Sequence, residues 1–391
     1  MMKGNIKKII YFIETPFDER DYERCGVYTL IENGFEVQIW DFTPFLNAYV
    51  YENDKDRRQK NNEFHRLFFS KKEALFEILN LDNSCFVVCF ITFAIGSFSI
   101  FKMLSKKEIK YCVFRANIIP LPSRKTRLFS LSYIKSGKLY ISKIMNLFFS
   151  DFAITKIGLK PATLLLAGGQ RSVSYNYPIT KDIEILWLHS LDYDIYLRKR
   201  DEVKENPHVG VFLDEYLPFH SDYIYFKVKP FATSEEYYPL ICRFFDNVER
   251  TNNVKIVVAA HPRSNYEKHG DLFDGRMVVK NKTFELLRES RFVIAHSSTA
   301  IDFAVLLKKP IIFITTNRLK KTREGPIIDA MATILGKKPI NIDEQFNIDL
   351  NEELIVNEKL YDQYRNDYIK KKNSEENYFW QIVANRLRQF H

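Results

Sequence analysis

Several common functional signatures are missing from this sequence of 391 residues. It contains no GxGxxG turn of a dinucleotide-binding unit and no GxxxxGK[ST] loop of a P-loop NTPase. It also lacks the GxSxG elbow that carries the nucleophile of many hydrolases. No low-complexity tract is present. These absences argue against a dinucleotide-dependent enzyme, a P-loop NTPase and a hydrolase of the nucleophile-elbow type.

Cysteine is scarce and scattered. The five cysteines form neither a CxxC pair nor an evenly spaced set: Cys25, Cys85, Cys89, Cys112 and Cys242. This pattern excludes a disulfide framework and a zinc knuckle, and it is typical of a reducing cytoplasm. We therefore expect a cytoplasmic protein with no metal site and no bound cofactor.

Long apolar runs are also missing. Residues 84–101 carry no charge, but a membrane span needs about 20 apolar residues, and Gly96 and several hydroxyl side chains interrupt this run. A buried strand over 85–92 followed by a helix from Ser97 is the simpler interpretation. The apolar stretch 9–13 is too short for the core of a signal peptide. We expect neither a membrane span nor a leader.

The positive charge is concentrated in one segment. The chain has a net charge of +9, and residues 102–160 hold 13 lysines and arginines against two acids. A solvated basic face and contact with an anionic surface are both open interpretations. The second would place the protein at the inner face of the cytoplasmic membrane, in peripheral contact with anionic lipid, or against an anionic acceptor. No nucleic-acid-binding module surrounds the segment, so nucleic acid is not an expected partner.

Strand-like and helix-like segments alternate along the chain, and the length allows two domains. The expected elements include a helix over 18–33 in the first half and strands over 209–213, 223–228 and 311–315 in the second. We therefore predict an α/β protein with two Rossmann-like domains facing a cleft. The predicted domains are residues 1–200, residues 208–350, and C-terminal helices over 351–391 that pack back on the first domain. The charged stretch 198–207 is the predicted linker.

Two polar clusters follow runs of strand-type residues in the second half. The first follows residues 254–260, and the second follows residues 292–295. Because ligands of an open parallel sheet bind beyond the carboxyl ends of its strands, these positions favour a binding site. Their imidazole, guanidinium and hydroxyl donors suit phosphate. The predicted nucleotide-binding residues are His261, Pro262, Arg263, His296, Ser297, Ser298 and Thr299.

Each cluster also has a simpler interpretation. The hydroxyl residues could merely cap a helix starting at Thr299, and His261 with Arg263 could lie in an ordinary surface loop. The two clusters lie one β-α-β unit apart, and this spacing favours a shared phosphate site.

The clusters resemble a pair of motifs in bacterial sialyltransferases, which are GT-B glycosyltransferases. In that group a His-Pro motif and a Ser-Ser/Thr motif contact the cytidine monophosphate moiety of the donor; the matches here are His261-Pro262 and Ser297–Thr299. Residues 292–315 are also similar to CDP-glycerol-dependent teichoic-acid transferases and capsule Kdo transferases. The resemblance covers about residues 209–320, and it implies a GT-B fold and a CMP-linked donor.

The general base is less well specified. Sialyltransferases take it from an acidic motif that ends in glycine, and the nearest match here, Asp214-Glu215, is followed by Tyr216. The pair could equally cap the next element. A sugar hydroxyl must lose a proton as it attacks, so we regard Asp214, Glu215 and His261 as candidate catalytic residues. Polar residues of the first domain and the junction are candidates for acceptor binding: Glu14, Asp18, Arg20 and Asp192.

The sequence thus predicts a glycosyltransferase of bacterial surface polysaccharide biosynthesis. We expect metal-independent, inverting transfer of a CMP-activated acidic sugar, such as a nonulosonic acid or Kdo, to a glycan or lipid-linked acceptor. A CDP-polyol phosphotransferase, a UDP-sugar epimerase of the same fold and a non-catalytic glycan-binding protein remain alternatives.

Overall fold

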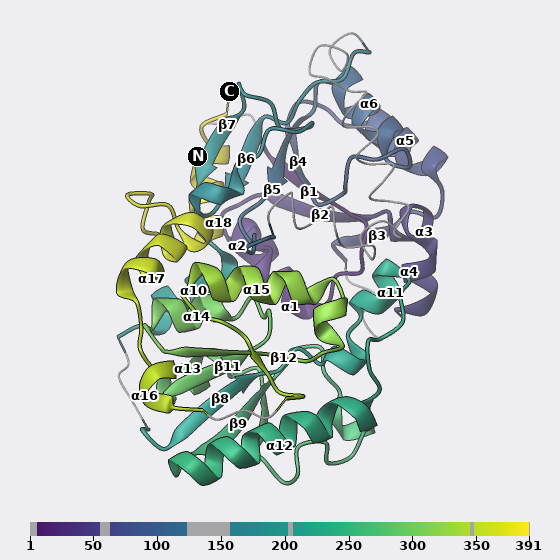
Figure 1. Ribbon diagram of the computed structural model, residues 1–391. Helices are drawn as coiled ribbons and strands as arrows, with labels where there is room; N and C mark the ends of the chain where they lie inside the picture. Colours follow the sequence, from purple (N-terminus) through teal and green to yellow (C-terminus); the bar gives the residue numbers. More distant parts are fainter. Residues whose placement is uncertain (1–5, 55–62, 123–156, 202–205, 345–347, 391) are drawn as a thin grey trace. The chain divides into compact units, whose positions relative to one another are not determined.

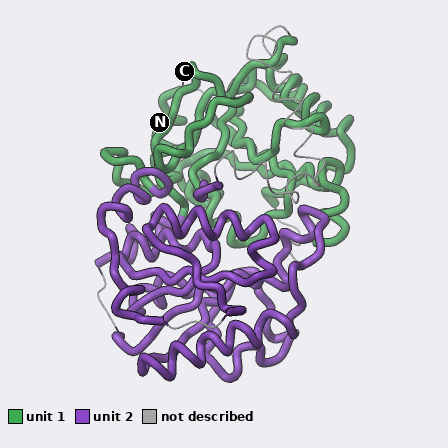
Figure 2. Tube along the Cα trace, viewed as in Figure 1, with its two compact units in different colours: residues 1–117, 136–191, 370–391 green, residues 118–135, 192–369 purple. Residues whose placement is uncertain are grey.

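The chain forms two compact α/β units (Figure 2). The computed structural model describes residues 6–54, 63–122, 157–201, 206–344 and 348–390. Unit 1 comprises residues 1–117, 136–191 and 370–391, and unit 2 comprises residues 118–135 and 192–369. Each unit has its own parallel sheet with helices on both faces, which is the Rossmann-like arrangement (Figure 1).

Unit 1 is built on a seven-stranded sheet in the order β3-β2-β1-β4-β5-β6-β7. Every adjacent pair of these strands is parallel. The strands are β1 Lys8–Ile13, β2 Glu36–Asp41, β3 His65–Leu67, β4 Cys85–Cys89, β5 Lys110–Phe114, β6 Leu164–Ala167 and β7 Glu184–Trp187.

Two apolar clusters cover the two faces of this sheet. One contains side chains of α1, α2 and α18, and the other contains side chains of α5 and α6. The helices of unit 1 are α1 Glu19–Arg24, α2 Val27–Glu32, α3 Thr43–Leu46, α4 Ala48–Asn53, α5 Lys71–Leu79, α6 Phe98–Lys106 and α18 Phe379–Leu387, with a 3-10 turn at Gln170–Ser172.

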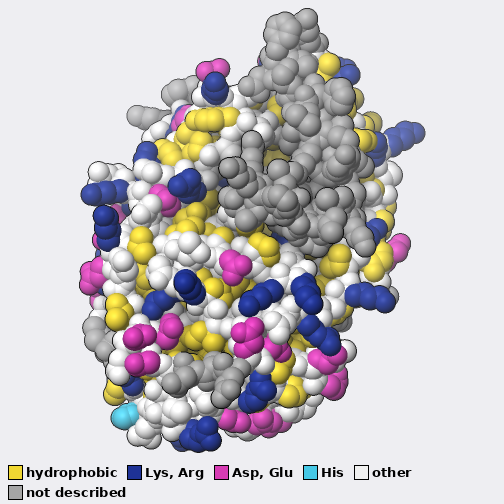
Figure 3. Space-filling view, in the orientation of Figure 1, with side chains coloured by type: hydrophobic (Ala, Val, Ile, Leu, Met, Phe, Trp, Pro, Cys, Tyr) yellow, Lys and Arg dark blue, Asp and Glu magenta, His cyan; other side chains and the backbone are white. Residues whose placement is uncertain are grey.

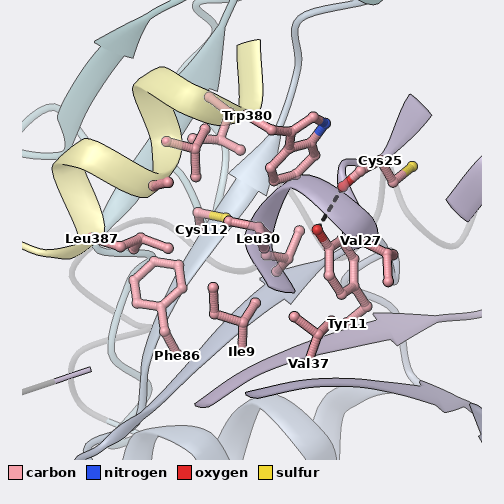
Figure 4. Close-up of a cluster of buried hydrophobic side chains, with 14 of the residues drawn as sticks. Ile9, Tyr11, Cys25, Val27, Leu30, Val37, Phe86, Cys112, Trp380 and Leu387 are labelled. Atoms are coloured by element: carbon pink, nitrogen blue, oxygen red, sulfur yellow. Dashed lines mark hydrogen bonds between the residues drawn. The ribbon is translucent and has the colours of Figure 1, made fainter. Parts of the chain in front are cut away.

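The C-terminal helix α18 belongs to the core of unit 1. Figure 4 shows Trp380 and Leu387 of this helix among side chains of the sheet and of α2, with Phe86 beside Leu387. The indole N–H of Trp380 donates to the carbonyl of Arg24 at 2.8 Å. The hydroxyl of Tyr11, on β1, donates to the carbonyl of Cys25 at 2.5 Å in the same cluster.

Unit 2 is built on a six-stranded parallel sheet in the order β10-β9-β8-β11-β12-β13. The central strands are continuous apolar runs, which is expected of parallel strands covered on both faces. The strands are β8 Val209–Leu213, β9 Lys255–Ala260, β10 Val278–Lys280, β11 Phe292–Ala295, β12 Ile311–Thr315 and β13 Ile340–Asn341.

Helix α12 supplies most of the helical side chains on one face of this sheet, and α10, α13, α14, α15 and α17 supply most of those on the other. The helices are α10 Leu191–Lys199, α11 Asp222–Phe226, α12 Ser234–Asn252, α13 Thr283–Glu289, α14 Ile301–Leu306, α15 Glu324–Ile334, α16 Leu350–Glu353 and α17 Glu358–Tyr364. Short 3-10 turns occur at Leu217–Phe219, Tyr266–Lys268 and Leu319–Lys321, and a π-helical segment at Arg365–Ile369.

Most predicted elements are confirmed, and two segments of the chain fold differently from the prediction. The predicted helix 18–33 is two helices, because Gly26 adopts a left-handed φ of +67° between them. Residues 223–228 were predicted as a strand but lie mostly in helix α11, none of whose side chains is buried. Its tyrosines and isoleucine suit either structure, so composition did not discriminate between them.

The unit boundaries differ from the expected ones in two places. The predicted linker begins inside α10, and its far end is held by a hydrogen bond from Asn206 N to the carbonyl of Glu289, within unit 2. Helices α16 and α17 also belong to unit 2, where the hydroxyl of Tyr364 donates to Asp302 at 3.2 Å. The chain returns to unit 1 at Lys370, later than residue 351.

The uncharged run 84–101 forms β4 and the start of α6, as expected. Within the described residues, no helix combines the length and the apolar character needed to cross a membrane. Most of the basic segment lies outside the described residues, so its predicted contact with an anionic surface stays a prediction. Over unit 2, the face in Figure 3 carries basic and acidic side chains interspersed.

Candidate functional site

The sheet of unit 2 places the predicted residues around one point. From β8, the chain adds β9 and β10 on one side and then β11, β12 and β13 on the other, so the strand order reverses between β8 and β11. Open α/β sheets bind ligands beyond the carboxyl ends of the strands at such a switch point. Residues 214–215 follow β8, residues 261–263 follow β9, and residues 296–299 follow β11.

Asp214 joins the ends of β8 and β9. Its side chain is buried, and its carboxylate accepts hydrogen bonds from the backbone N–H of Tyr216 at 2.9 Å and of His261 at 3.3 Å. The hydroxyl of Tyr266 also donates to it, at 2.6 Å. Burial raises the pKa of Asp214, and these three donors oppose that shift. A carboxylate held by three protein donors is suited to fixing the geometry of the loops around it.

Glu215 joins the ends of β8 and β11. Its carboxylate accepts hydrogen bonds from the backbone N–H of Ser297 at 2.7 Å and from the Ser297 hydroxyl at 3.1 Å. Burial raises the pKa of Glu215 to about 7, although both bonds from Ser297 favour the ionised form. The residue can therefore gain or lose a proton near neutral pH.

His261, Pro262 and Arg263 form a tight turn at the end of β9. The backbone N–H of Ser264 donates to the carbonyl of His261 at 2.9 Å, which places Pro262 at the second position of the turn, where proline is favoured. The backbone N–H of Arg263 lies 3.3 Å from Nδ1 of His261. Nδ1 accepts this bond, and a neutral imidazole that accepts at Nδ1 carries its proton on Nε2. All three side chains are half-buried.

His296 does not have the predicted binding role. It is fully buried, its Nδ1 lies 2.7 Å from the carbonyl of Ile314, and its Nε2 lies 2.8 Å from the hydroxyl of Tyr237. Burial lowers its pKa to about 4, so the ring is neutral, with Nδ1 donating and Nε2 accepting. Sequence position suggested a ligand contact, but both nitrogens are engaged inside the core.

The remaining residues of the second cluster precede α14. Ser297 and Ser298 are half-buried and Thr299 is exposed. The hydroxyl of Ser298 accepts from the backbone N–H of Ala300 at 3.3 Å, and the helix begins at Ile301, two residues later than predicted. Ser298 thus stabilises the turn before the helix, while Ser297 contacts Glu215.

The predicted acceptor residues belong to both units, three to unit 1 and one to unit 2. Glu14, after β1, accepts from the backbone N–H of Thr92 at 3.1 Å and from its hydroxyl at 2.6 Å. Asp18 caps α1 through reciprocal bonds with Asp21, both of 3.1 Å. Arg20 is half-buried within α1, whereas Asp192 is buried in the first turn of α10 and belongs to unit 2.

Sequence reasoning missed an aromatic cluster that surrounds Asp214. The hydroxyl of Tyr216 lies 2.7 Å from Nε2 of His269, and the ring of His269 stacks on Phe219 with a centroid separation of 3.9 Å. The ring of Tyr266 packs edge-on against that of Tyr216, at 5.1 Å. No periodicity in the sequence marks these residues, because their loops meet only in the folded unit.

Solved structures share this architecture. Over 99% of this chain and 90% of the other, the wall teichoic acid polymerase TagF matches with a TM-score of 0.54 at 10% identity. The chain has the GT-B fold. The UDP-GlcNAc 2-epimerase of Methanocaldococcus jannaschii matches with a TM-score of 0.44 at 13% identity, over 97% of this chain and 99% of the other. MurG of Acinetobacter baumannii matches with 0.47 at 8% identity, over 98% and 100%. No protein-family model and no curated protein matches the sequence.

Proposed function

We propose that the protein is a nucleotide-sugar-dependent glycosyltransferase whose donor nucleotide binds in unit 2. One observation carries the proposal: Asp214 and Glu215 connect the loops after three neighbouring strands by hydrogen bonds to His261 and Ser297. The two motifs recognised in the sequence therefore border the same switch point, where the GT-B topology favours a ligand.

The donors at this point suit a leaving nucleotide phosphate. Nε2–H of His261, the guanidinium of Arg263 and the hydroxyls of Ser298 and Thr299 belong to side chains that are half-buried or exposed. Donors oriented before the reaction stabilise charge as it develops, with little reorganisation. In our proposal these groups, without a metal, hold the phosphate as the bond between its oxygen and the anomeric carbon breaks.

Glu215 is the carboxylate that we propose as general base. With a pKa of about 7 it can accept the proton of an acceptor hydroxyl as that oxygen bonds to the anomeric carbon. Asp214, held by three donors, acts as a positioning residue. A single displacement of this kind inverts the anomeric configuration.

The favoured donor is a CMP-activated acidic sugar, such as a nonulosonic acid or Kdo, and the favoured acceptor is a glycan or lipid-linked precursor of a bacterial surface polymer. Both rest on the sialyltransferase-like motifs. Transfer from a CDP-polyol is the second candidate, because residues 292–315 resemble CDP-glycerol-dependent transferases and the fold matches a wall teichoic acid polymerase.

Nucleotide binding tests the proposal. CMP, CDP and UDP would each be titrated into the protein by calorimetry, beside His261→Ala and, as a matched control, the exposed His208→Ala. We expect CMP to bind, His261→Ala to weaken binding at least tenfold, and His208→Ala to leave it unchanged. CDP binding alone would favour polyol transfer, and UDP binding alone would refute the cytidine donor and favour a UDP-sugar enzyme.

Turnover is the second step of the test. Incubation with CMP-linked nonulosonic acid or Kdo should release CMP, and Glu215→Gln should reduce the rate at least a hundredfold with little change in CMP affinity. A protein that binds none of the three nucleotides would contradict the transferase proposal and favour a glycan-binding role.

A further inference from the structure

Unit 1 contains a guanidinium that lacks an acidic partner among the described residues. Arg115 directly follows β5, and its backbone N–H donates to the carbonyl of Leu166 on the neighbouring strand β6. Its terminal nitrogen donates to the hydroxyl of Ser174 at 2.5 Å. Its Nε is buried and has no hydrogen-bond partner within the described part of the chain.

The position of Arg115 is unfavourable for its positive charge. The side chain is half-buried and burial lowers its pKa, and no carboxylate of the described residues opposes this shift. The other arginines of the described unit 1 include Arg386, which makes a two-pronged ion pair with Glu184 at 2.5 and 2.6 Å. A partly desolvated charge without a counter-charge costs stability unless a ligand compensates it.

Other polar groups lie at the same edge of the sheet. The loop after β6 begins with Gly168, whose backbone N–H donates to the hydroxyl of Ser172 at 3.1 Å and whose carbonyl accepts from the backbone N–H of Lys371 at 3.3 Å. The ammonium of Lys371 lies 4.0 Å from the ring centroid of Trp187, the last residue of β7. The Lys371 ammonium is thus a second cation at the carboxyl ends of these strands.

The segment after β7 also reaches β5. The backbone N–H of Leu191 donates to the side chain of Asn117, two residues after Arg115, at 2.8 Å. The neighbouring Ser190 is 2% exposed, and its hydroxyl has no partner among the described residues. The carboxyl ends of β5, β6 and β7 therefore share hydroxyl and cationic groups, at the edge where open parallel sheets bind ligands.

We propose that Arg115 binds an anionic group, a carboxylate or a phosphate, at the carboxyl ends of β5 and β6. Building on the proposed function, this group belongs to the acceptor: a carboxylate of an acidic glycan or a phosphate of a lipid-linked precursor. A planar guanidinium with an unused Nε–H can donate two parallel hydrogen bonds to either group.

The experiment uses the full chain with inorganic phosphate and with glucuronate as probes, at constant ionic strength, with neutral galactose as the blank. Binding is followed by the rise in unfolding temperature and by calorimetry. We expect at least one anion to bind, and Arg115→Met to weaken that binding tenfold or more. Arg386→Met, which removes an ion-paired guanidinium, should leave it unchanged. Phosphate alone would identify a phosphorylated acceptor, and glucuronate alone an acidic glycan.

The donor site provides the separating control. Anion binding that survives in His261→Ala and is lost in Arg115→Met supports the proposal, even if no nucleotide binds to unit 2. The reverse pattern, or no anion binding by the parent protein, would overturn it. Without anions, Arg115→Met should unfold at the same or a higher temperature than the parent, because it removes an uncompensated charge. A clear loss of stability there would instead assign Arg115 a structural role.

Discussion

The carboxylate of Glu215 accepts hydrogen bonds from both the backbone N–H and the hydroxyl of Ser297, at 2.7 and 3.1 Å. This pair spans the switch point of unit 2, between β8 and β11. Unit 1 has an equivalent pair, since Glu14 accepts from the N–H and the hydroxyl of Thr92 across the switch point between β1 and β4. In each unit, a glutamate after the first strand thus accepts two hydrogen bonds from a serine or threonine that follows the strand across the switch point.

The first prediction concerns the pH dependence that Glu215 gives to stability. Its pKa is about 7 in the folded protein and near 4.5 when unfolded, so the folded state binds the proton more tightly. The resulting stabilisation is complete below about pH 4.5 and is lost as pH rises through about 7. Its upper limit is about 3 kcal/mol, which partial exposure reduces.

Glu215→Gln removes this linkage because glutamine is neutral at every pH. Relative to the parent, the variant should gain free energy of unfolding between pH 5 and pH 8, as measured by urea denaturation. The exposed Glu352→Gln is the control and should show no such gain. A parent and a Glu215→Gln variant with parallel pH profiles would mean that Glu215 is ionised throughout.

The second prediction concerns the buried bond between Tyr237 and His296. Removing one partner leaves the other unsatisfied in the core, at a cost of roughly 1–3 kcal/mol per group. His296→Phe also leaves the carbonyl of Ile314 without its hydrogen bond from Nδ1. It should therefore destabilise unit 2 more than Tyr237→Phe. The double variant should be less destabilised than the sum of the two, because neither partner is then left alone.

Acid sensitivity gives His296 a second readout. Its folded pKa of about 4 is below the ordinary value of 6.5, so its contribution to stability is present above pH 6.5 and is lost as pH falls toward 4. His296→Phe should flatten the loss of stability over this range in urea titrations. An unchanged slope would show that the ring is protonated in the folded protein.

Local sequence identified the central strands well and the roles of side chains less well. Strands 209–213, 292–295 and 311–315 were predicted with the observed bounds, because each is a continuous apolar run buried on both faces. The short strands β3 and β10 were missed, since three residues carry no detectable alternation.

In the candidate site, too, local sequence predicted positions along the chain better than side-chain contacts. The sequence made Glu215 and Ser297 candidates, but their contact joins residues 82 positions apart and depends on the strand order. The prediction that His296 contacts a ligand was wrong. Its ring is buried by contacts with Tyr237 and Ile314, which its local sequence does not reveal. Asp214 likewise owes its environment to Tyr266, which no local pattern marks.

The third prediction tests this role of Tyr266. Its hydroxyl donates to the buried Asp214 at 2.6 Å, and hydrogen bonds to charged groups contribute about 1.5–3 kcal/mol. Tyr266→Phe should lower the free energy of unfolding by about that amount and weaken the proposed nucleotide binding, because Asp214 also holds the backbone of His261. The hydroxyl of Tyr238 makes only a 3.3 Å contact with that of Tyr266. Tyr238→Phe should therefore have a smaller effect on stability and on nucleotide binding. Equal effects would argue against a special role for the Asp214 contact.

The fourth prediction concerns the contact between Gly26 and the C-terminal helix. Gly26 has a φ of +67°, and a Cβ at this position would lie 2.0 Å from Cγ of Trp380. Gly26→Ala therefore combines left-handed strain of about 1–2 kcal/mol with displacement of a buried indole. Since truncating a buried tryptophan costs about 3–5 kcal/mol, we expect a total loss of about 4 kcal/mol or more in urea unfolding.

Gly158 supplies the matched control for this prediction. Its φ is +75°, but a Cβ there would meet nothing within 4 Å. Gly158→Ala should therefore cost only the strain of about 1–2 kcal/mol. In the background of Trp380→Ala, the extra cost of Gly26→Ala should fall to that same value, because the indole is no longer in the way. A cost that stays near 4 kcal/mol in this background would mean that α18 is not what makes Gly26 necessary.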